Sequence, residues 1–513
     1  MEKISIDGAG LTLEDLLRVV RGAAEVELSP AARERMTASR AVVERVIASD
    51  GAVYGVNTGF GKLASVRVSK DQIRELQANL VRSHACGVGE PLSEEETRGM
   101  LLLRANAIAK GYSGVRPVVV ETLCAMLNQG VHPVIPSQGS VGASGDLAPL
   151  AHLAQVAIGE GEAYYKGWRE RGEEAMRSAG ISPLELEAKE GLALLNGTQA
   201  MLSLLSLALV RAEIAADTAD VAAALSLDAL RGSPAAFDQR IAQVRQHPGQ
   251  FTTAKNLEKL NRGSEIRESH RSSETDKRVQ DAYSLRCAPQ VHGAVRDALT
   301  GIRRTVEVEL NSATDNPLVF AAEGGEPGAG EIISGGNFHG QPLAMAADQL
   351  ALALATLGGI SERRIEQMTN PQTSLLPAFL VQEPGLNSGF MMLQVTAAAL
   401  ASEMRVQAAP HSVGSIPTSA NQEDYVSMGM GAARRLRPMV ESLQRILAIE
   451  LMAACQGIDL LAPLKTGAKA QMAYEKVRAI SKPVAQDRSL AGEIEALAES
   501  LANGEISEIL KAE

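Results

Sequence analysis

The sequence is poor in the residue types that build disulfide, metal and nucleic-acid sites. Its four cysteines lie far apart and form no Cys-x-x-Cys pair, which is typical of reduced thiols in a cytoplasmic protein. The eight histidines show neither His-Glu-x-x-His nor a comparable spacing, so we expect no metal site. No basic stripe is interleaved with aromatic residues and the net charge is -11, which argues against a nucleic-acid partner but leaves small anionic or zwitterionic substrates open.

Two further absences concern export and membranes. The first residues, Met1 to Asp7, lack the apolar core of a signal peptide, so secretion is not expected. The stretch from Gly191 to Val210 carries no charge and is long enough to raise a membrane-spanning interpretation. Polar residues such as Asn196 near its middle, and the charges that resume at Arg211, favour a buried helix of a large soluble core. We therefore expect no membrane partner.

What the sequence does contain is a change of pattern along its length. Residues 1–195 mix short extended pieces with helices such as 94–110 and 118–129, and their glycines cluster as loops that meet at a site would. From residue 196 onward the pattern becomes long, helical and rich in alanine and leucine. We therefore predict a mainly α protein with a smaller N-terminal domain, 1–195, and a long central helical bundle, 196–513. Candidate long helices span 198–230, 341–369, 388–407 and 433–460.

Local signals predict three further features. Asp146 is a candidate N-cap for a helix over 147–158, which Gly159 would end. Residues 262–278 mix charges and serines without apolar periodicity, which predicts a surface loop leading into a helix at Gln280. On that helix Gln280, Tyr283 and Arg286, spaced three apart, would form an inclined row on one side.

The run from Gly142 to Asp146, GASGD, has too few functional side chains for conventional catalysis, so its use must lie in the backbone. Gly145 has no Cβ, and its amide nitrogen can therefore approach the carbonyl of Ala143 closely. Ring closure with loss of water, together with dehydration of Ser144, would yield 4-methylideneimidazol-5-one (MIO), an electrophile made from the protein itself. Judged alone, such a run is more often an ordinary turn, and a phosphate-binding interpretation lacks the Lys-Ser/Thr that would follow.

The longer run from Gly139 to His152, GSVGASGDLAPLAH, resembles the signature of the aromatic amino acid ammonia-lyases. In that family the tripeptide matching Ala143, Ser144 and Gly145 forms MIO. Other segments agree with the family in the same order, so that the resemblance spans roughly residues 50–430. They are 54–61 (YGVNTGFG), 191–199 (GLALLNGTQ), 283–287 (YSLRC), 314–317 (TDNP), 335–339 (GGNFH), 384–390 (PGLNSGF) and 419–423 (SANQE).

The resemblance implies a fold and an assembly. The family has a mainly α, fumarase/aspartase-like architecture, and it is usually a homotetramer whose active sites each combine residues from several subunits. Such an assembly would explain how candidate residues dispersed over hundreds of positions converge. MIO would be the only prosthetic group, with no external cofactor.

The resemblance also implies residue roles. The methylene derived from Ser144 would take up the substrate amine and make it easier to expel, which is covalent catalysis with the protein as electrophile. Tyr54 matches the lid tyrosine and would remove the β-proton, although an ordinary tyrosine pKa of about 10 needs help from positive charge or a dipole. Arg286 would hold the substrate carboxylate through its planar fork. Supporting roles would fall to Asn196 and Gln280 as polar contacts, Tyr283 at the electrophile or the departing amine, and Phe338 against the prosthetic group.

Substrate choice rests on His84 and Glu423. Within the family a histidine at the position of His84 occurs in lyases acting on histidine or tyrosine, and Glu423 matches the carboxylate that histidine-specific members direct at the imidazole. A site that leaves both groups unpaired against a phenyl ring rejects phenylalanine by about 10⁴-fold or better. We therefore expect elimination of ammonia from L-histidine to give trans-urocanate, the first step of histidine breakdown. Tyr425 stands where the histidine-specific members of the family usually have histidine, two residues after the glutamate, which bears on fine specificity and rate more than on reaction class.

Several alternatives stay open. A tyrosine ammonia-lyase or an MIO-dependent aminomutase would also use His84, and a catalytically inactive helical scaffold would keep the fold alone. Taken singly, Tyr54 would be a packed aromatic beside glycine turns and Arg286 an ion-pair partner. By the same standard Asn196 would be a helix N-cap, and Glu423 a helix-start acid in a capping-box-like run.

Overall fold

The computed structural model describes residues 2–48, 69, 72–272, 274–324 and 326–511. Helices dominate these residues, and the strands are short and pair in small sheets. The chain divides into two compact units, each assembled from three stretches of sequence. Unit 1 comprises Met1–Leu207, Arg303–Asp348 and Pro410–Arg434, and unit 2 comprises Ala208–Ile302, Gln349–Ala409 and Arg435–Glu513.

The unit boundaries at residues 207, 302 and 348 fall inside long helices. These helices are α9 (Gln199–Ala229), α14 (Ala288–Leu310) and α15 (Gln341–Thr369). The predicted mainly α architecture with long helices is confirmed. The split into domains 1–195 and 196–513 stays a prediction, and the compact units differ from it because 303–348 and 410–434 pack with the N-terminal part.

Unit 1 combines shorter helices with all strands of the described residues. Strands β1 and β2 pair in parallel, whereas β3–β5, β4–β6–β7 and β8–β9 are antiparallel. Its strands are β1 (Glu2–Ile6), β2 (Ala24–Leu28), β3 (Val88–Pro91), β4 (His132–Pro133), β5 (Pro136–Gln138), β6 (Glu162–Tyr165), β7 (Trp168–Arg171), β8 (Leu318–Ala321) and β9 (Gly330–Ile333). Its helices are α1 (Leu13–Val20), α2 (Pro30–Ala48), α3 (Ile73–His84), α4 (Glu94–Ala109), α5 (Pro117–Gln129), α6 (Leu147–Ala157), α7 (Gly172–Ser178), α8 (Glu190–Leu195) and α18 (Gly429–Arg434).

Local sequence explains where the unit 1 helices begin and end. The Ser93 hydroxyl accepts a hydrogen bond from the backbone N–H of Glu96, whose carboxylate accepts one from the N–H of Ser93, so a capping box starts α4. Pro117 occupies the first turn of α5, and Gly130 ends that helix with a left-handed φ of 74°. The helices predicted at 94–110 and 118–129 are therefore confirmed.

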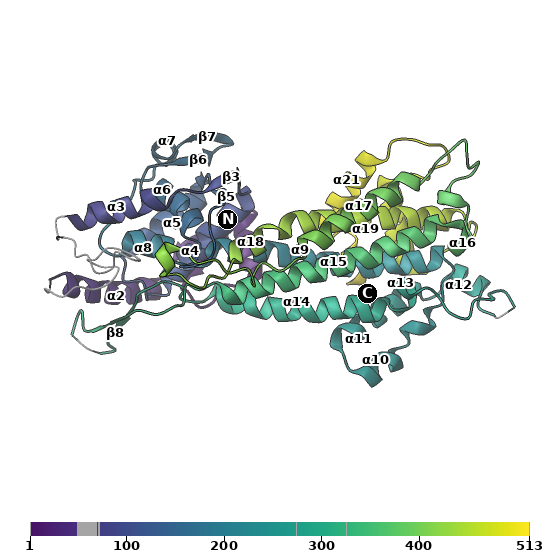
Figure 1. Cartoon of the computed structure of the whole chain (residues 1–513), viewed down its shortest axis with the longest axis horizontal. Helices are drawn as coiled ribbons and strands as arrows, with labels where there is room; N and C mark the ends of the chain where they lie inside the picture. The colour runs from purple at the N-terminus through teal and green to yellow at the C-terminus, as the bar shows by residue number, and fades with distance from the viewer. Residues whose placement is uncertain (1, 49–68, 70–71, 273, 325, 512–513) are drawn as a thin grey trace. The chain divides into compact units, whose positions relative to one another are not determined.

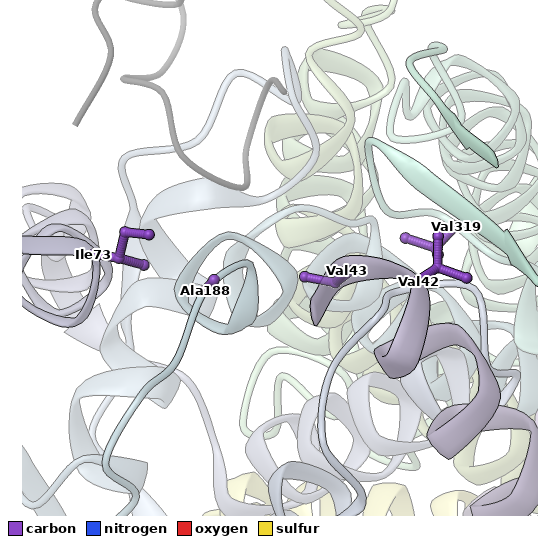
Figure 2. Close-up of a cluster of buried hydrophobic side chains, with 5 residues drawn as sticks. All are labelled: Val42, Val43, Ile73, Ala188 and Val319. Carbon is purple, nitrogen blue, oxygen red and sulfur yellow. The ribbon is translucent and has the colours of Figure 1, made fainter. Parts of the chain in front are cut away.

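A buried apolar cluster joins distant parts of the sequence inside unit 1. Val42 and Val43 of α2 pack with Val319 of β8, and Ala188 and Ile73 complete the cluster (Figure 2). Burying apolar surface stabilises a fold by about 25 cal/mol per Å². The cluster therefore helps to hold the β8–β9 hairpin, which is remote in sequence, against the N-terminal helices.

The regular elements among the described residues of unit 2 are all helices. Figure 1 shows α17 and α19 side by side, and the two helices pack against each other. They match the helices predicted at 388–407 and 433–460 but begin a few residues later. The unit contains α10 (Gln239–Arg245), α11 (Pro248–Asn261), α12 (Glu265–Ser269), α13 (Tyr283–Arg286), α16 (Pro371–Ser374), α17 (Met391–Gln407), α19 (Leu436–Asp459), α20 (Ala468–Ile480), α21 (Ala491–Ala502) and the short 3₁₀ segments η3 (Pro234–Phe237), η4 (Ala378–Leu380) and η6 (Ser507–Leu510).

Two helices, α9 and α15, are long and apolar enough to cross a membrane by length and composition alone. Their most apolar windows are largely buried inside the protein, 78% for α9 and 61% for α15. A helix that is hydrophobic on all sides and buried in this way is typical of a protein core. The stretch 191–210 is buried as expected, but it comprises most of α8, a turn at 196–198 and the start of α9 rather than one helix.

Two local predictions in unit 2 are wrong. Residues 262–278 are not a continuous loop, because the Ser264 hydroxyl accepts from the N–H of Arg267 and starts α12. Gln280 does not lie on a helix with Tyr283 and Arg286, because α13 begins only at Tyr283. The segment before α13 is instead tied down by Asp281, whose carboxylate accepts from the backbone N–H of Ser233 at 2.6 Å.

Candidate active site

The Gly-rich loop (Gly142–Asp146) connects β5 to α6 in unit 1. Gly145 has a left-handed φ of 75°, and a Cβ there would lie 2.2 Å from the carbonyl oxygen of Gly197. The two glycines form an isolated parallel bridge, and the N–H of Asp146 donates to the same carbonyl at 2.7 Å. Only glycine permits this approach of two backbones. The loop is thus fixed by main-chain contacts with the turn between α8 and α9.

Asn196 ends α8 and holds the Gly-rich loop from one side. Its Nδ2 donates to the carbonyl oxygen of Ser144 at 2.8 Å, and the residue is 3% exposed. Its Oδ1 is buried without a hydrogen-bond partner. An unsatisfied buried acceptor costs about 1–3 kcal/mol, so it favours a nearby donor that the open chain does not provide. The donation from Asn196 Nδ2 to the Ser144 carbonyl, which would become the ring carbonyl, and the tight backbone at Gly145 fit a prosthetic ring built from Ala143, Ser144 and Gly145. Such a ring carries no N–H, so the orphaned Oδ1 is left as an acceptor for a donor from a bound molecule.

Glu423 faces the loop from the far part of the sequence. The Ser144 hydroxyl donates to Glu423 Oε1 at 3.0 Å, and the Thr418 hydroxyl donates to Glu423 Oε2 at 2.7 Å. Between Thr418 and Glu423, the 3₁₀ segment η5 (Ser419–Asn421) has three consecutive residues with φ between 50° and 65°. Left-handed backbone at non-glycine residues is costly and clusters at functional sites. The strained turn therefore aims the carboxylate at Ser144, and Thr418 is a site residue that the sequence reasoning missed.

Two further hydrogen bonds join the chain just after Glu423 to the glycine-rich region. The Ser427 hydroxyl donates to the carbonyl oxygen of Gly142 at 3.0 Å, and the backbone N–H of Met428 donates to the carbonyl oxygen of Val141 at 2.8 Å. Both residues are adjacent to α18, which also packs against β5. The register between Glu423 and the Gly-rich loop is therefore set by backbone pairing as well as by the side chain.

Asp146 is a second residue whose role the sequence reasoning missed. It stands at the N-cap position of α6 as predicted, but its side chain makes no capping bond there. Instead Oδ2 accepts from the N–H of Met201 in α9 at 2.9 Å, and Oδ1 accepts from the Ser140 hydroxyl at 3.3 Å. Complete burial raises the pKa of Asp146 to about 7, although these hydrogen bonds oppose the shift. An acid placed directly after the Gly145 turn can hold or release a proton near neutral pH. Its position immediately after the tripeptide was the available signal.

A buried polar network supports the turn that receives the loop. Arg104 donates to Gln199 Oε1 at 2.6 Å, and Gln199 Nε2 donates to the Thr314 hydroxyl at 2.8 Å. A Cβ on Gly197 would collide with Arg104 Nη1 at 2.2 Å. Burial lowers the pKa of Arg104 to about 10, so the guanidinium stays charged. Thr314, the first residue of the TDNP segment, thereby fixes the Asn196–Gln199 turn through Gln199.

Phe338 lies in the turn after β9, and it is half-buried. Asn316 braces this turn, because its Oδ1 accepts from the N–H of Gly335 at 2.7 Å. The next residue, His339, stacks on Tyr425 with ring centroids 6.2 Å apart, and its Nε2 lies 3.3 Å from the Tyr425 carbonyl oxygen. Tyr425, the departure from the family pattern, is therefore a stacking partner of the Phe338 turn.

His84 is the last residue of α3 and is half-buried. Its Nδ1 lies 2.9 Å from the carbonyl oxygen of Leu80. The residues after His84 lie beside the residues that precede the Gly-rich loop. Strand β3 pairs with β5, and a Cβ on Gly139 would lie 3.0 Å from the Cα of Gly87. The N–H of Gly87 also donates to His152 Nε2 at 3.1 Å. The pairing brings the chain that carries His84 towards the Gly-rich loop, without a direct side-chain contact to Ser144 among the described hydrogen bonds.

Gln280, Tyr283 and Arg286 gather in the α13 segment (Gln280–Arg286) of unit 2. The guanidinium of Arg286 donates to Gln280 Oε1 and lies 5.8 Å from the ring centroid of Tyr283. Tyr283 is 72% exposed. The predicted trio therefore forms one cluster, by a turn rather than along a helix.

The candidate residues thus form two described groups. Ala143, Ser144, Gly145, Asn196 and Glu423 meet directly in unit 1, whereas the α13 segment belongs to unit 2. Tyr54, the expected base, lies outside the described residues.

Comparisons with known proteins agree along the whole chain. Residues 11–479 match the family model described as aromatic amino acid lyase. The histidine ammonia-lyase of Koribacter versatilis (strain Ellin345) is 54% identical over 99% of this chain and 99% of that protein. The one from Myxococcus xanthus (strain DK1622) is 54% identical over 98% of this chain and 97% of that protein.

Solved structures show the same relationship. The structure of histidine ammonia-lyase from Trypanosoma cruzi has a TM-score of 0.91 at 44% identity, covering 99% of this chain and 95% of that chain. Tyrosine aminomutase from Streptomyces globisporus has a TM-score of 0.93 at 40% identity, covering 99% and 98%.

Proposed function

The chain belongs to the aromatic amino acid lyase family, and we propose that it is a cytoplasmic histidine ammonia-lyase. It would eliminate ammonia from L-histidine to give trans-urocanate, the first step of histidine degradation. Relatives named as histidine ammonia-lyases match almost the full length of the chain at 50–54% identity. The single observation that carries the proposal within the structure is the contact between Ser144 and Glu423.

That contact has a consequence for substrate choice. Formation of the ring expels the Ser144 hydroxyl oxygen as water, which removes the donor that now satisfies Glu423 Oε1 at 3.0 Å. Thr418 still occupies the other carboxylate oxygen. The freed lone pairs then favour a new N–H donor beside the ring, and an imidazole N–H supplies one whereas a phenyl ring does not. A charged hydrogen bond of this kind contributes about 1.5–3 kcal/mol.

His84 complements this preference. A carbonyl oxygen only accepts hydrogen bonds, so Nδ1 of His84, 2.9 Å from the Leu80 carbonyl, carries the proton. Nε2 then keeps its lone pair as a fixed acceptor. We assign it a polar contact with the substrate, and the same acceptor would suit a phenol in the tyrosine-specific alternative.

The α13 segment is proposed to bind the α-carboxylate. Arg286 offers two parallel N–H donors in a planar fork, the geometry that a carboxylate accepts best. Gln280 and Tyr283 already contact Arg286, which limits the rotamers of its guanidinium. Tyr283 would additionally face the electrophile or the departing amine.

The prosthetic group would be MIO, formed from Ala143, Ser144 and Gly145, and it supplies an electrophilic methylene for the substrate amine. Asn196 would hold it through the Ser144 carbonyl, and Phe338 would pack against it. We assign removal of the β-proton to Tyr54, acting as general base. These residues position the substrate and move its proton, and they require no external cofactor.

A homotetramer with shared active sites is the proposed assembly. Large apolar side chains on α17 face solvent in the single chain, including Met392 (61% exposed), Val395 (46%) and Val406 (76%). Exposed apolar residues gathered on one helix favour a protein interface. The high solvent exposure of Tyr283 in the single chain fits an active site that a neighbouring chain completes.

The decisive experiment measures reaction and covalent state together. We expect urocanate from L-histidine, and peptide mass spectrometry should show the loss of two waters within Ala143–Gly145. Ser144→Ala should abolish both while the protein stays folded. An unmodified tripeptide in active wild-type protein would contradict the proposed chemistry.

A second experiment separates the substrates. Glu423→Gln should reduce kcat/KM for histidine by about 10-fold to 100-fold, because one charge-assisted hydrogen bond weakens, while the loss of two waters remains complete. Wild-type turnover of L-tyrosine above that of L-histidine, or formation of a β-amino acid, would instead favour the tyrosine lyase or aminomutase. Folded protein that neither forms the ring nor turns over any amino acid would favour the inactive scaffold.

A further inference from the structure

A cluster of buried charges lies inside unit 2, and none of its members is among the candidate catalytic residues. Asp220 of α9, His292 of α14, Arg364 of α15 and Glu450 of α19 are each about 0% exposed. Burying four ionisable side chains is costly unless each is paired. Their presence among apolar helices therefore calls for a specific role.

Glu450 and Arg364 form the centre of this network. Arg364 Nε and Nη2 donate to the two oxygens of Glu450 at 2.5 and 2.9 Å. The hydroxyls of Ser226 and Ser361 donate to the same carboxylate at 2.8 and 2.5 Å. The carboxylate is thus saturated, and the guanidinium plane of Arg364 is fixed by a two-pronged contact.

The remaining donor group of Arg364 points along a chain of hydrogen bonds. Its Nη1 lies 3.2 Å from His292 Nε2, and arginine has no acceptor, so Nε2 must accept and Nδ1 must carry the proton. Nδ1 in turn donates to Asp220 Oδ1 at 2.8 Å. Burial lowers the pKa of His292, which agrees with a neutral imidazole between Asp220 and Arg364. Arg296 pairs with Asp220 at 2.6 Å, so two carboxylates face two guanidinium groups.

This chain ends on the α13 segment. Arg364 Nη1 also donates to the carbonyl oxygen of Ser284 at 3.3 Å, and Ser284 lies between the two candidate substrate residues Tyr283 and Arg286. A helix of one turn is not stable by itself, because nucleation costs more than a single turn returns. The orientation of α13 must therefore come from contacts such as this one.

We propose that the buried network is a positioning device for substrate binding, in which Arg364, clamped by Glu450 and oriented by neutral His292, sets the backbone of α13 and thereby the direction of Arg286. The proposal rests on the function proposed above, in which Arg286 binds the carboxylate. Arg364 and His292 are positioning residues, because they act through the carbonyl of Ser284.

The test uses the full-length protein and two mild substitutions. Arg364→Lys keeps a positive charge beside Glu450. The single ammonium group of lysine cannot donate to the Glu450 carboxylate, His292 and Ser284 at the same time, as the planar guanidinium does. We expect KM for L-histidine to rise about 10-fold, the effect of one lost hydrogen bond, with a smaller change in kcat. The loss of two waters within Ala143–Gly145 should be unchanged, and so should the inhibition constant of histamine, which lacks the carboxylate.

A pair of variants at His292 provides an internal rescue. His292→Leu removes the acceptor for Arg364 and should reproduce the rise in KM, whereas His292→Gln offers an amide oxygen and should restore most of the affinity. Tyr474→Phe is the matched control in the same unit. It removes a hydroxyl that donates to Asp459, the partner of Arg478, and should lower thermal stability without changing KM.

The outcomes separate this proposal from the proposed function. Dissociation constants are also measured calorimetrically in a Ser144→Ala background, where no turnover is needed. Equal weakening of histidine and histamine, or an unchanged affinity for histidine in folded Arg364→Lys, would overturn the positioning role. If the wild type instead turns over L-tyrosine, the proposed substrate fails, and the ratio of tyrosine to tyramine affinity decides the positioning role in the same way.

Discussion

The Gly-rich loop and the α13 segment differ in how completely the single chain holds them. Ala143 is 7% exposed and Asp146 0%, and the loop is pinned by Asn196, Glu423 and the backbone of Gly197. In the α13 segment Tyr283 is 72% exposed, and the helix is a single turn. The Gly-rich loop is held by direct contacts on several sides, whereas the α13 segment is held mainly through its backbone, by the buried Arg364.

The difference follows from the roles proposed for the two regions, ring formation in the loop and carboxylate binding in the α13 segment. Ring closure requires the Gly145 nitrogen and the Ala143 carbonyl carbon to be held close together before any substrate binds. A rigid backbone favours this step. Binding a carboxylate needs an accessible guanidinium that substrate can reach. The comparison predicts that substitutions in the loop abolish the electrophile, whereas substitutions in the α13 segment leave its formation complete.

The largest effect is expected for Gly145→Ala. The added Cβ would lie 2.2 Å from the Gly197 carbonyl oxygen at a left-handed φ, so the backbone has to move away. We expect no loss of two waters by mass spectrometry and a fall in kcat of about 10³-fold or more, as for the loss of an essential catalytic group.

Gly130→Ala is the matched control for this prediction. Gly130 has a similar φ of 74°, but a Cβ there meets nothing within 4 Å. It should cost about 1 kcal/mol of stability and leave the electrophile complete. If Gly145→Ala still loses both waters, the close approach to Gly197 is not what the ring requires.

Next in size is Arg286→Gln. Removing the guanidinium deletes a charge-assisted contact of about 1.5–3 kcal/mol, so KM for L-histidine should rise about 10-fold to 100-fold. Ring formation should be complete, because the loop is held by other residues. Arg271→Gln removes an exposed arginine that pairs with Glu268 and should leave KM unchanged. Loss of the ring in Arg286→Gln would break the separation between the two regions.

Apolar periodicity predicted the long helices well, because burial of a continuous apolar stripe decides their extent. The helix predicted over 341–369 coincides with α15, and the one over 198–230 nearly coincides with α9. Periodicity could not predict α13, since a four-residue turn has no period and its place depends on Arg364 and Asp281.

The site shows the same division. The resemblance identified Ser144, Asn196 and Glu423, and the structure brings these three into direct contact. Thr418 and the direction of the Asp146 side chain depend on a strained turn and on the start of α9. Neither leaves a spacing signal in the sequence, because each is a tertiary contact. The same holds for the Arg364 network, whose members are spread over 231 positions from Asp220 to Glu450.

A smaller effect is expected for Thr418→Val, which preserves shape and removes the hydroxyl that donates to Glu423. With one hydrogen bond lost, kcat/KM for histidine should fall about 10-fold while the two waters are still expelled. Thr37→Val is the control, because the Thr37 hydroxyl only bonds its own helix at Arg33. An equal fall for L-histidine and for a substrate without an imidazole would show that Thr418 shapes the loop in general rather than Glu423.

The smallest effect concerns pH and Asp146. Its pKa is about 7 in the folded protein and about 4 in an unfolded chain, so the folded state holds the extra proton between these values. Folding stability contributed by this group is therefore largest below pH 4 and is lost as the pH rises to about 7. Asp146→Asn has no such proton, so between pH 5 and pH 8 its melting temperature should fall about 2 °C less than that of the wild type. Equal slopes in the two proteins would mean that Asp146 is already ionised in its buried position. The loop would then be held by a charged cap on α9 rather than by an acid able to deliver a proton beside Gly145.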